Sequence, residues 1–358
     1  MQINDILKVM VERNASDLLI KPGVPPTFRV DGLYQDHDAP KLTAAAAREL
    51  IAQMTDDKQK QLFDEERELD FAYSVEGLAR FRVNVYLQAG NLAAAIRVIP
   101  LSVMTLDELG MPPILKKLAE KPRGLILLTG PTGSGKSTTI AAMIDHVNTT
   151  RRCHIMTIED PIEFLHTDKK AIVDQREVGR DTLSFNNALK RVLRQDPNVI
   201  VIGEMRDLET IAIAITAAET GHLVFATLHT GSAAQTIDRV VDVFPASQQS
   251  QIRSQLSLAL EGVICQVLIP KADGKGRVAA MEILTASSAV RSQIRANDLA
   301  MIGSTILTSR QEGMQTLDYA LKELVDSKTV TLEAAAAKAA NPDQFLKANT
   351  PAVFGKKK

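Results

Sequence analysis

The sequence contains few cysteines and few aromatic residues. Two of its 358 residues are cysteine, none is tryptophan, and aromatic residues make up 4%. Cys153 and Cys265 lie far apart and belong to no C-x-x-C motif, so neither a disulfide framework nor a zinc knuckle is indicated. The scarcity of aromatic residues leaves no stripe of rings on which single-stranded nucleic acid could stack.

The chain also lacks a charge bias and a long apolar run. The 42 Lys and Arg residues nearly balance the 43 Asp and Glu residues, so there is no general attraction to nucleic acid or anionic lipid. Residues 211–228 are the most apolar stretch, but Glu219, Gly221 and His222 interrupt it, and the N-terminus has no signal-peptide pattern. We therefore expect a cytoplasmic protein without a transmembrane segment or direct contact with nucleic acid.

The stretch from 125 to 139 reads LILLTGPTGSGKSTT, a short apolar run followed by a phosphate-binding loop of the form G-x-x-x-x-G-K-[ST]. Glycines allow a tight turn whose N–H groups point at phosphate oxygens, and the following helix directs its positive end to the same place. We expect a lysine near the β- and γ-phosphates of ATP and a serine hydroxyl on Mg²⁺. The predicted nucleotide-binding residues of this loop are Gly130, Pro131, Thr132, Gly133, Ser134, Gly135, Lys136, Ser137 and Thr138.

Acidic residues follow two further predicted strands. The strand at 154–158 is followed by Glu159, Asp160 and Glu163, which we expect to help Ser137 hold Mg²⁺ and to orient a nucleophilic water. The strand at 199–202 ends in Gly203 and Glu204. This is the position of a Walker B motif in which Gly203 replaces the usual aspartate, so Glu204 becomes the candidate general base.

Two histidines bracket a predicted strand at 223–227. A lone histidine is most often structural, but His229 follows the strand end and is expected to face the γ-phosphate region. Alternating strands and helices around a phosphate loop predict an α/β fold with a mostly parallel sheet over residues 114–358. Helices are expected to dominate after residue 247, with one short β-hairpin at 267–283.

Residues 1–99 are expected to form a separate, smaller α+β domain, joined through a linker at 100–113. Arg80, Arg82 and Arg97 all lie on its predicted strands. Two interpretations remain open for them: a solvated basic sheet face, or side chains that reach a nucleotide held by the second domain or a neighbouring subunit.

The motifs together resemble those of the secretion ATPase superfamily, and within it the PilT-type retraction ATPases of type IV pili. The matching segments are GPTGSGKSTT at 130–139, TIEDPIE at 157–163, QREVG at 175–179, DPNVIVIGEMRDLET at 196–210 and TGHLVFATLHT at 220–230. The resemblance implies a PAS-like domain joined to a RecA-like ATPase domain, assembled as a homo-hexamer. It also implies a platform protein of the inner membrane as partner, with the ring peripheral on the cytoplasmic side.

The same resemblance implies roles for individual side chains. His222 and His229 would sense the state of the bound nucleotide. The arginines that stabilise the transferring phosphoryl group would be among Arg194, Arg239, Arg80, Arg82 and Arg97.

One segment departs from the retraction motors. They usually carry a helix close to AIRNLIRE, where this chain has AVRSQIRA at 289–296. The long N-terminal extension and four-cysteine insertion of extension and secretion ATPases are not expected here, which favours retraction. The alternatives are a PilU-like accessory motor, a pilus-assembly or secretion ATPase, a RecA-like nucleic-acid motor, and a nucleotide-binding scaffold without turnover.

Overall fold

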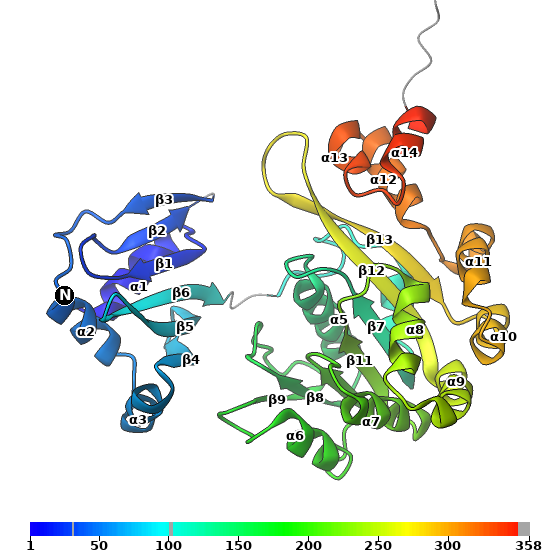
Figure 1. The fold of residues 1–358 in the computed structure, drawn as a ribbon, viewed down its shortest axis with the longest axis horizontal. Helices are drawn as coiled ribbons and strands as arrows, with labels where there is room; N and C mark the ends of the chain where they lie inside the picture. Colours follow the sequence, from blue (N-terminus) through cyan, green and yellow to red (C-terminus); the bar gives the residue numbers. More distant parts are fainter. Residues whose placement is uncertain (31, 100–102, 350–358) are drawn as a thin grey trace, which may run out of the picture. The chain divides into compact units, whose positions relative to one another are not determined.

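The structure is a computed structural model that describes residues 1–30, 32–99 and 103–349 (Figure 1). The chain divides into two compact units. The first comprises Met1–Ser102 together with the short stretch Glu163–Leu165, and the second comprises Val103–Ile162 and His166–Lys358.

The first unit is built on a six-stranded sheet in the order β3-β2-β1-β6-β5-β4, in which every neighbouring pair is antiparallel. Its helices are α1 (Ile3–Glu12), α2 (Ala44–Ala52) and α3 (Asp57–Glu66). Its strands are β1 (Asp17–Ile20), β2 (Thr27–Val30), β3 (Leu33–Asp36), β4 (Glu68–Val75), β5 (Ala79–Gln88) and β6 (Asn91–Ile99).

Hydrophobic periodicity explains how these elements pack. The apolar residues of α1 recur at helical spacing, and Ile6, Leu7 and Met10 are buried against the sheet. Along β5, Phe81 and Val83 are buried in the same core, while Arg82 between them faces the other side. One face of the sheet is therefore core and the other is polar, which confirms the predicted α+β domain.

The second unit is built on a seven-stranded sheet in the order β13-β12-β7-β11-β10-β8-β9. All neighbours are parallel except β12 and β13. The strands are β7 (Gly124–Thr129), β8 (His154–Glu159), β9 (Ile172–Glu177), β10 (Val199–Ile202), β11 (Leu223–Thr227), β12 (Leu260–Pro270) and β13 (Arg277–Thr285).

Helices cover both faces of this sheet. The helices of the unit are α4 (Ile114–Ala119), α5 (Lys136–Thr150), α6 (Phe185–Val192), α7 (Leu208–Glu219), α8 (Ala233–Asp242), α9 (Ala246–Ala259), α10 (Ser288–Ala296), α11 (Ile302–Thr308), α12 (Leu317–Asp326), α13 (Leu332–Ala336) and α14 (Pro342–Asn349). Short 3₁₀ turns lie at η1 (Leu299–Met301) and η2 (Arg310–Glu312).

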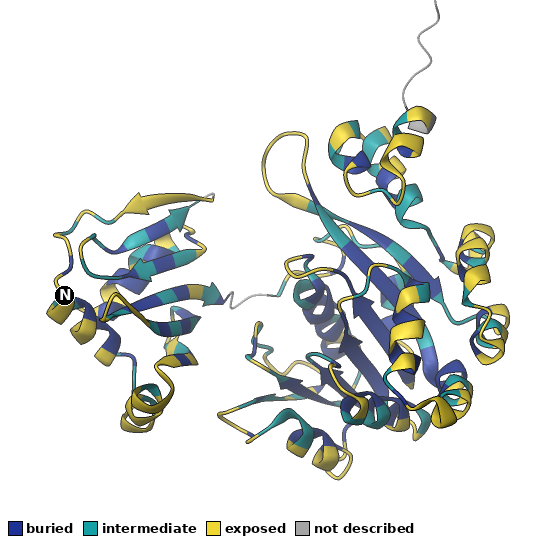
Figure 2. Ribbon diagram, viewed as in Figure 1, coloured by how far each residue is buried: buried dark blue, intermediate teal, exposed yellow. Residues whose placement is uncertain are grey.

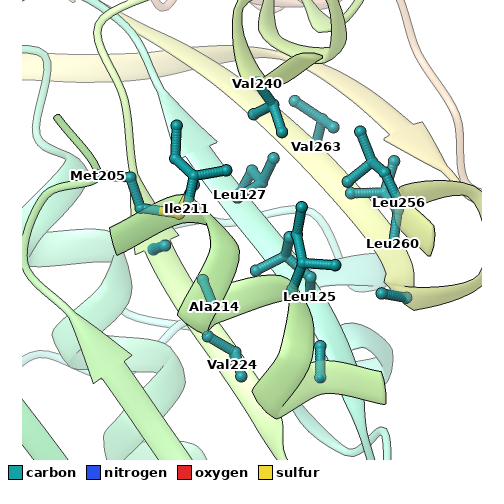
Figure 3. Close-up of a cluster of buried hydrophobic side chains, with 14 of the residues drawn as sticks. Leu125, Leu127, Met205, Ile211, Ala214, Val224, Val240, Leu256, Leu260 and Val263 are labelled. Atoms are coloured by element: carbon teal, nitrogen blue, oxygen red, sulfur yellow. The ribbon is translucent and has the colours of Figure 1, made fainter. Parts of the chain in front are cut away.

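The central strands of the second unit are buried from end to end (Figure 2). Along β7, Leu125 and Leu127 face a core shared with α6 to α11, while Ile126 and Leu128 face a core shared with α4 and α5. Figure 3 shows part of the first core, where Leu127 and Ile211 lie together. Two-sided burial explains why these strands are continuously apolar, and it confirms the predicted α/β ATPase-type domain.

Three segments differ from the sequence expectation. Residues 100–102 of the expected linker lie outside the described residues, and the rest of it packs into the second unit, because Leu106 is buried beside α4. The short hairpin expected at 267–283 is longer: β12 continues the large sheet alongside β7, and β13 forms its antiparallel edge. Strand β9, which the sequence analysis did not predict, forms the other edge.

The C-terminal helices pack on the outer end of this hairpin. Ile269 of β12 and Ala280 of β13 share a small core with helices α12 to α14, which contribute Leu321, Ala335 and Phe345. Within residues 1–30, 32–99 and 103–349, no helix is long and apolar enough to cross a membrane. Both cysteines are free, and burial raises the pKa of the Cys265 thiol to about 12, which disfavours the thiolate form at neutral pH.

Candidate nucleotide site

The phosphate loop connects β7 to α5 and has the backbone that its glycines predict. Gly130, Gly133 and Gly135 have φ angles of 135°, 75° and 87°, a region that other residues rarely adopt. Gly135 is the N-cap of α5, and no side chain caps the N–H groups of the first helical turn. These groups and the helix dipole make the start of α5 a site for an anion.

Lys136 folds back over this loop. Its Nζ donates to the carbonyl oxygens of Gly130 at 2.8 Å and Pro131 at 3.1 Å, and the residue is 9% exposed. The ammonium group is therefore held beside the backbone that would surround a phosphate, as the motif predicts.

Glu204 and His229 come together from neighbouring strands. Ile202 pairs with Ala226, so the segments after β10 and β11 leave the sheet side by side. His229 Nε2 lies 3.3 Å from Glu204 Oε1, and Arg206 lies 2.7 Å from Glu204 Oε2. The hydrogen bond from Arg206 is the main cause that lowers the pKa of Glu204, against partial burial, and the charges of Arg206 and His229 act in the same direction. Glu204 is thus an oriented carboxylate that can accept a proton or position water.

The surroundings of Gly203 explain why glycine stands where a Walker B motif usually has aspartate. A Cβ atom at this position would lie 3.2 Å from the carbonyl oxygen of Ile158 and 3.5 Å from the Cα of Glu159. The Gly203 N–H donates to that same Ile158 oxygen at 2.9 Å, and its carbonyl accepts a bond from Thr227 Oγ1. The close approach of β10 to β8 leaves little room for a side chain at this point.

The acidic segment after β8 follows a strand that lies farther from β7 than β10 does. Three strand spacings separate β7 from β8, which is roughly 14 Å. Glu159 Oε1 accepts bonds from Thr157 Oγ1 at 2.7 Å and Gln175 Nε2 at 3.2 Å, while Asp160 and Glu163 are exposed. Among the described residues, no three His, Cys, Asp or Glu side chains converge into a metal-binding group. Ser137 remains the expected protein ligand nearest to the loop, because Mg²⁺ at such sites needs only one or two protein ligands beside phosphate oxygens and water.

Comparison with known proteins shows the family of the chain. The family model described as "Type II/IV secretion system protein" matches residues 1–344. The chain belongs to this secretion system protein family.

Two relatives and one solved structure are similar to the chain over most of their lengths. The chain is 52% identical over 345 residues to the Pseudomonas aeruginosa "Type IV pilus retractation ATPase PilT", which covers 96% of this chain and 100% of that protein. It is 49% identical over 320 residues to a Neisseria gonorrhoeae "Twitching motility protein", covering 89% and 86%. The structure titled "Crystal Structure of the Pilus Retraction Motor PilT and Bound ADP" has a TM-score of 0.90 and 46% identity, covering 96% of this chain and 98% of that one.

Two of the expected arginines, Arg194 and Arg239, belong to the second unit. Arg194 follows α6 and precedes β10, so it lies near the strand starts, and Arg239 lies on α8. Both are exposed, and neither side chain forms an ion pair with another described residue. Their assignment as charge-stabilising groups remains a prediction.

The arginines of the first unit belong to its polar sheet face. Arg82 pairs with Arg97 across β5 and β6, and Arg97 pairs with Asp17 across β6 and β1. Arg97 Nε lies 2.9 Å from Asp17 Oδ1, and Arg82 Nε lies 3.6 Å from Asp70 Oδ1. These four side chains line an open hollow of about 310 Å³. Arg80 on the same strand is buried, at 7% exposed.

His222 does not lie at the phosphate loop of its own domain. It precedes β11, and its carbonyl accepts a bond from Gly124 N at the start of β7. The length of β7 places this edge roughly 20 Å from Gly130. His222 Nδ1 lies 2.9 Å from the carbonyl oxygen of Ala217, a structural contact at the end of α7. The prediction that His222 binds nucleotide therefore has no support within one subunit.

The sequence analysis missed two residues that organise the site. Arg206 pairs with Glu204, and its place two residues after the carboxylate gave no signal of this contact. Gln266 is a buried amide behind the phosphate loop. An isolated polar residue in the apolar run VICQVLI was the available signal.

Proposed function

We propose that this chain is the ATP-hydrolysing motor that retracts a type IV pilus and thereby powers twitching motility and DNA uptake. The observation that carries the proposal is the full-length similarity to a relative named as a pilus retraction ATPase, and it is supported by a phosphate-loop motif and by a Glu204 carboxylate beside His229. The N–H groups of the loop and Lys136 bind the phosphates of ATP.

The remaining steps follow from the side chains around the loop. When Mg²⁺ is bound with ATP it neutralises the charge that develops on the phosphate oxygens, and Ser137 is the residue that would hold it. Glu159, Asp160 and Glu163 are proposed to act on the metal through water or to orient the attacking water. Glu204, held by Arg206 and adjacent to His229, accepts the proton of that water.

The proposal includes a homo-hexameric ring. The resemblance of the motifs supports a ring at the cytoplasmic side of the inner membrane, where it would act on a pilus platform protein. An arginine from another domain or subunit, among Arg80, Arg82, Arg97, Arg194 and Arg239, would complete the site. Hydrolysis coupled in this way to rigid-body motion would generate force.

Deletion of the gene in its source organism tests the direction of force. Excess pili without twitching support retraction, and complementation by the wild type but not by Lys136→Ala assigns the effect to the phosphate loop. Loss of pili would indicate an assembly ATPase, and lost motility with a normal number of pili would indicate an accessory motor.

Assays of the purified protein separate the other classes. Release of phosphate from ATP without DNA supports a motor of the proposed kind. Activity that requires DNA would support a nucleic-acid motor, and tight binding without phosphate release would support a regulatory scaffold.

A further inference from the structure

Gln266 is a polar residue inside an apolar strand. It lies on β12 and is 2% exposed. Because Cys265 pairs with Thr129 of β7, Gln266 lies alongside the beginning of the phosphate loop. A buried amide is stable only when its donors and acceptors are hydrogen-bonded, so its partners show which segments it holds.

Both ends of the Gln266 amide are bonded to the phosphate-loop region. Nε2 donates to the carbonyl oxygen of Ser134 at 2.7 Å, and Oε1 accepts from Thr139 Oγ1 at 2.8 Å. A carbonyl can only accept, so the nitrogen must face Ser134 and the oxygen must face the Thr139 hydroxyl. Gln266 therefore joins the loop residue before Gly135 to the first turn of α5.

The glycines of the loop are fitted to the same residue. A Cβ atom on Gly130 would lie 2.3 Å from the backbone oxygen of Gln266, and a Cβ on Gly135 would lie 2.8 Å from its Nε2. Both distances are shorter than real contacts of Cβ atoms. At Gly130 and Gly135, any side chain would therefore collide with Gln266 of β12, in addition to being disfavoured by the φ angle.

We propose that Gln266 is a positioning residue of the nucleotide site, which fixes the phosphate loop through Ser134 and Thr139. It acts on the direction of the loop N–H groups and on the start of α5, where Lys136 and Ser137 lie. The inference rests on the proposed function only in taking the loop as the place where ATP binds.

The test compares Gln266→Met with wild type. Methionine fills a similar volume but makes neither bond, so the Ser134 carbonyl loses its buried partner. A displacement of about 1 Å at a reacting group can cost roughly 10²-fold in rate, so we expect kcat/KM for ATP to fall about 10- to 100-fold. Affinity for ADP with a fluorescent ribose label should also fall.

The chain offers a matched control pair. Gln293 of α10 and Thr305 of α11 form the same kind of bond, at 2.8 and 3.2 Å, in the C-terminal helices of the same unit. Gln293→Met removes a glutamine–threonine contact without touching the loop and should retain wild-type kinetics and ADP affinity.

A second variant covers the case in which Gln266→Met does not fold. Thr139→Val removes one hydroxyl and should lower kcat/KM in the same direction, whereas Thr139→Ser keeps the hydroxyl and should restore most of the activity. Equal activity of the valine and serine variants would contradict the positioning role.

Hydrogen exchange of residues 130–139 without nucleotide separates this inference from the proposed function. Exchange there should be faster in Gln266→Met than in wild type and unchanged in Gln293→Met. Wild-type exchange rates in folded Gln266→Met, or ATP kinetics within about threefold of wild type, would overturn the inference. If wild-type protein failed to bind or hydrolyse ATP, the proposed function would fall, while the exchange data would still decide the role of Gln266.

Discussion

The two sheets of this chain arrange their polar residues in different ways. In the second unit, β7, β10 and β11 run in parallel, and Lys136, Glu204 and His229 all follow the ends of these strands. In the first unit, neighbouring strands are antiparallel, and Arg82, Arg97 and Asp17 form a row across the middle of one face. A parallel sheet collects functional groups at one edge because its strand ends coincide, whereas an antiparallel sheet collects them through cross-strand pairing.

The difference extends to burial. The parallel strands are covered on both faces, so their side chains form core and leave only the loops for chemistry. The antiparallel sheet has one open face, where arginine and aspartate side chains can meet solvent or a ligand. Any ligand of the first sheet should therefore be bound by individual arginine and aspartate side chains, whereas phosphate binding at the second sheet should depend on the backbone of the loops that follow its strands.

Lys136→Ala should have the largest effect on activity, since it removes the positive charge from the phosphate loop. We expect weaker ATP binding and a loss of turnover on the order of 10³. Phosphate release and ADP binding measure the two effects. Lys116→Ala is the control, because Lys116 pairs with Asp107 in the same unit at 2.6 Å and lies outside the site. Turnover of Lys136→Ala at the wild-type rate would contradict the assignment of the phosphate loop as the nucleotide site.

Glu204→Gln should separate binding from turnover. The amide keeps the shape of the side chain but cannot accept the proton of water, so we expect a loss of roughly 10² to 10⁴ in kcat with ATP binding retained. Glu209→Gln, which alters a carboxylate paired with Lys190, is the matched control. Equal loss of binding in Glu204→Gln would mean that this residue holds the metal or the fold instead.

Mixed rings test whether an arginine of one subunit acts at the phosphate loop of another. Lys136→Ala subunits are mixed in equal amounts with Arg239→Ala or with Arg97→Ala subunits, each inactive alone if that arginine acts in trans. About a quarter of the interfaces should then combine an intact loop with an intact arginine and recover activity. Recovery with Arg97→Ala would assign the acting arginine to the antiparallel sheet of the first unit, and recovery with Arg239→Ala would assign it to helix α8 of the second unit. The same activity per intact loop in isolated monomers and in rings would exclude a trans arginine.

Local sequence signals predicted most of the fold. The apolar runs of β7, β10 and β11, the glycines of the loop and the helical stripe of α1 each depend on neighbours close in sequence, and all appear in the structure. Glu204 and His229 were expected at strand ends, and their 3.3 Å contact follows from the order of β10 and β11.

Long-range contacts could not be predicted in this way. The extension of β12 along β7 and the edge strand β9 depend on pairings between distant segments, as do the bonds from Gln266 to Ser134 and Thr139. Strand direction puts His222 at the opposite edge of its own sheet, so the nucleotide contact that the motif implies for it stays a prediction. Periodicity shows that a residue lies on a strand but not which distant strand it pairs with.

Arg206→Ala should have the smallest effect and should appear as a shift in pH dependence. Glu204 must be ionised to accept a proton, so activity is lost as pH falls through its pKa. Arg206 lowers that pKa below the ordinary value of 4.5, which keeps the wild-type acid limb at low pH. Without Arg206, only His229 opposes the effect of partial burial on the pKa of Glu204, so the acid limb of the activity profile should move to higher pH.

The ion pair itself should contribute little to stability. The Arg206 side chain is 75% exposed and that of Glu204 27%, so the contribution should be below about 1 kcal/mol. That contribution is present above the ordinary pKa of the carboxyl and is lost as pH falls through the lowered pKa.

Measuring kcat against pH, with circular dichroism to confirm folding and Lys190→Ala as control, would show the shift. Coincident acid limbs in Arg206→Ala and wild type would mean that the proton acceptor is a group other than Glu204.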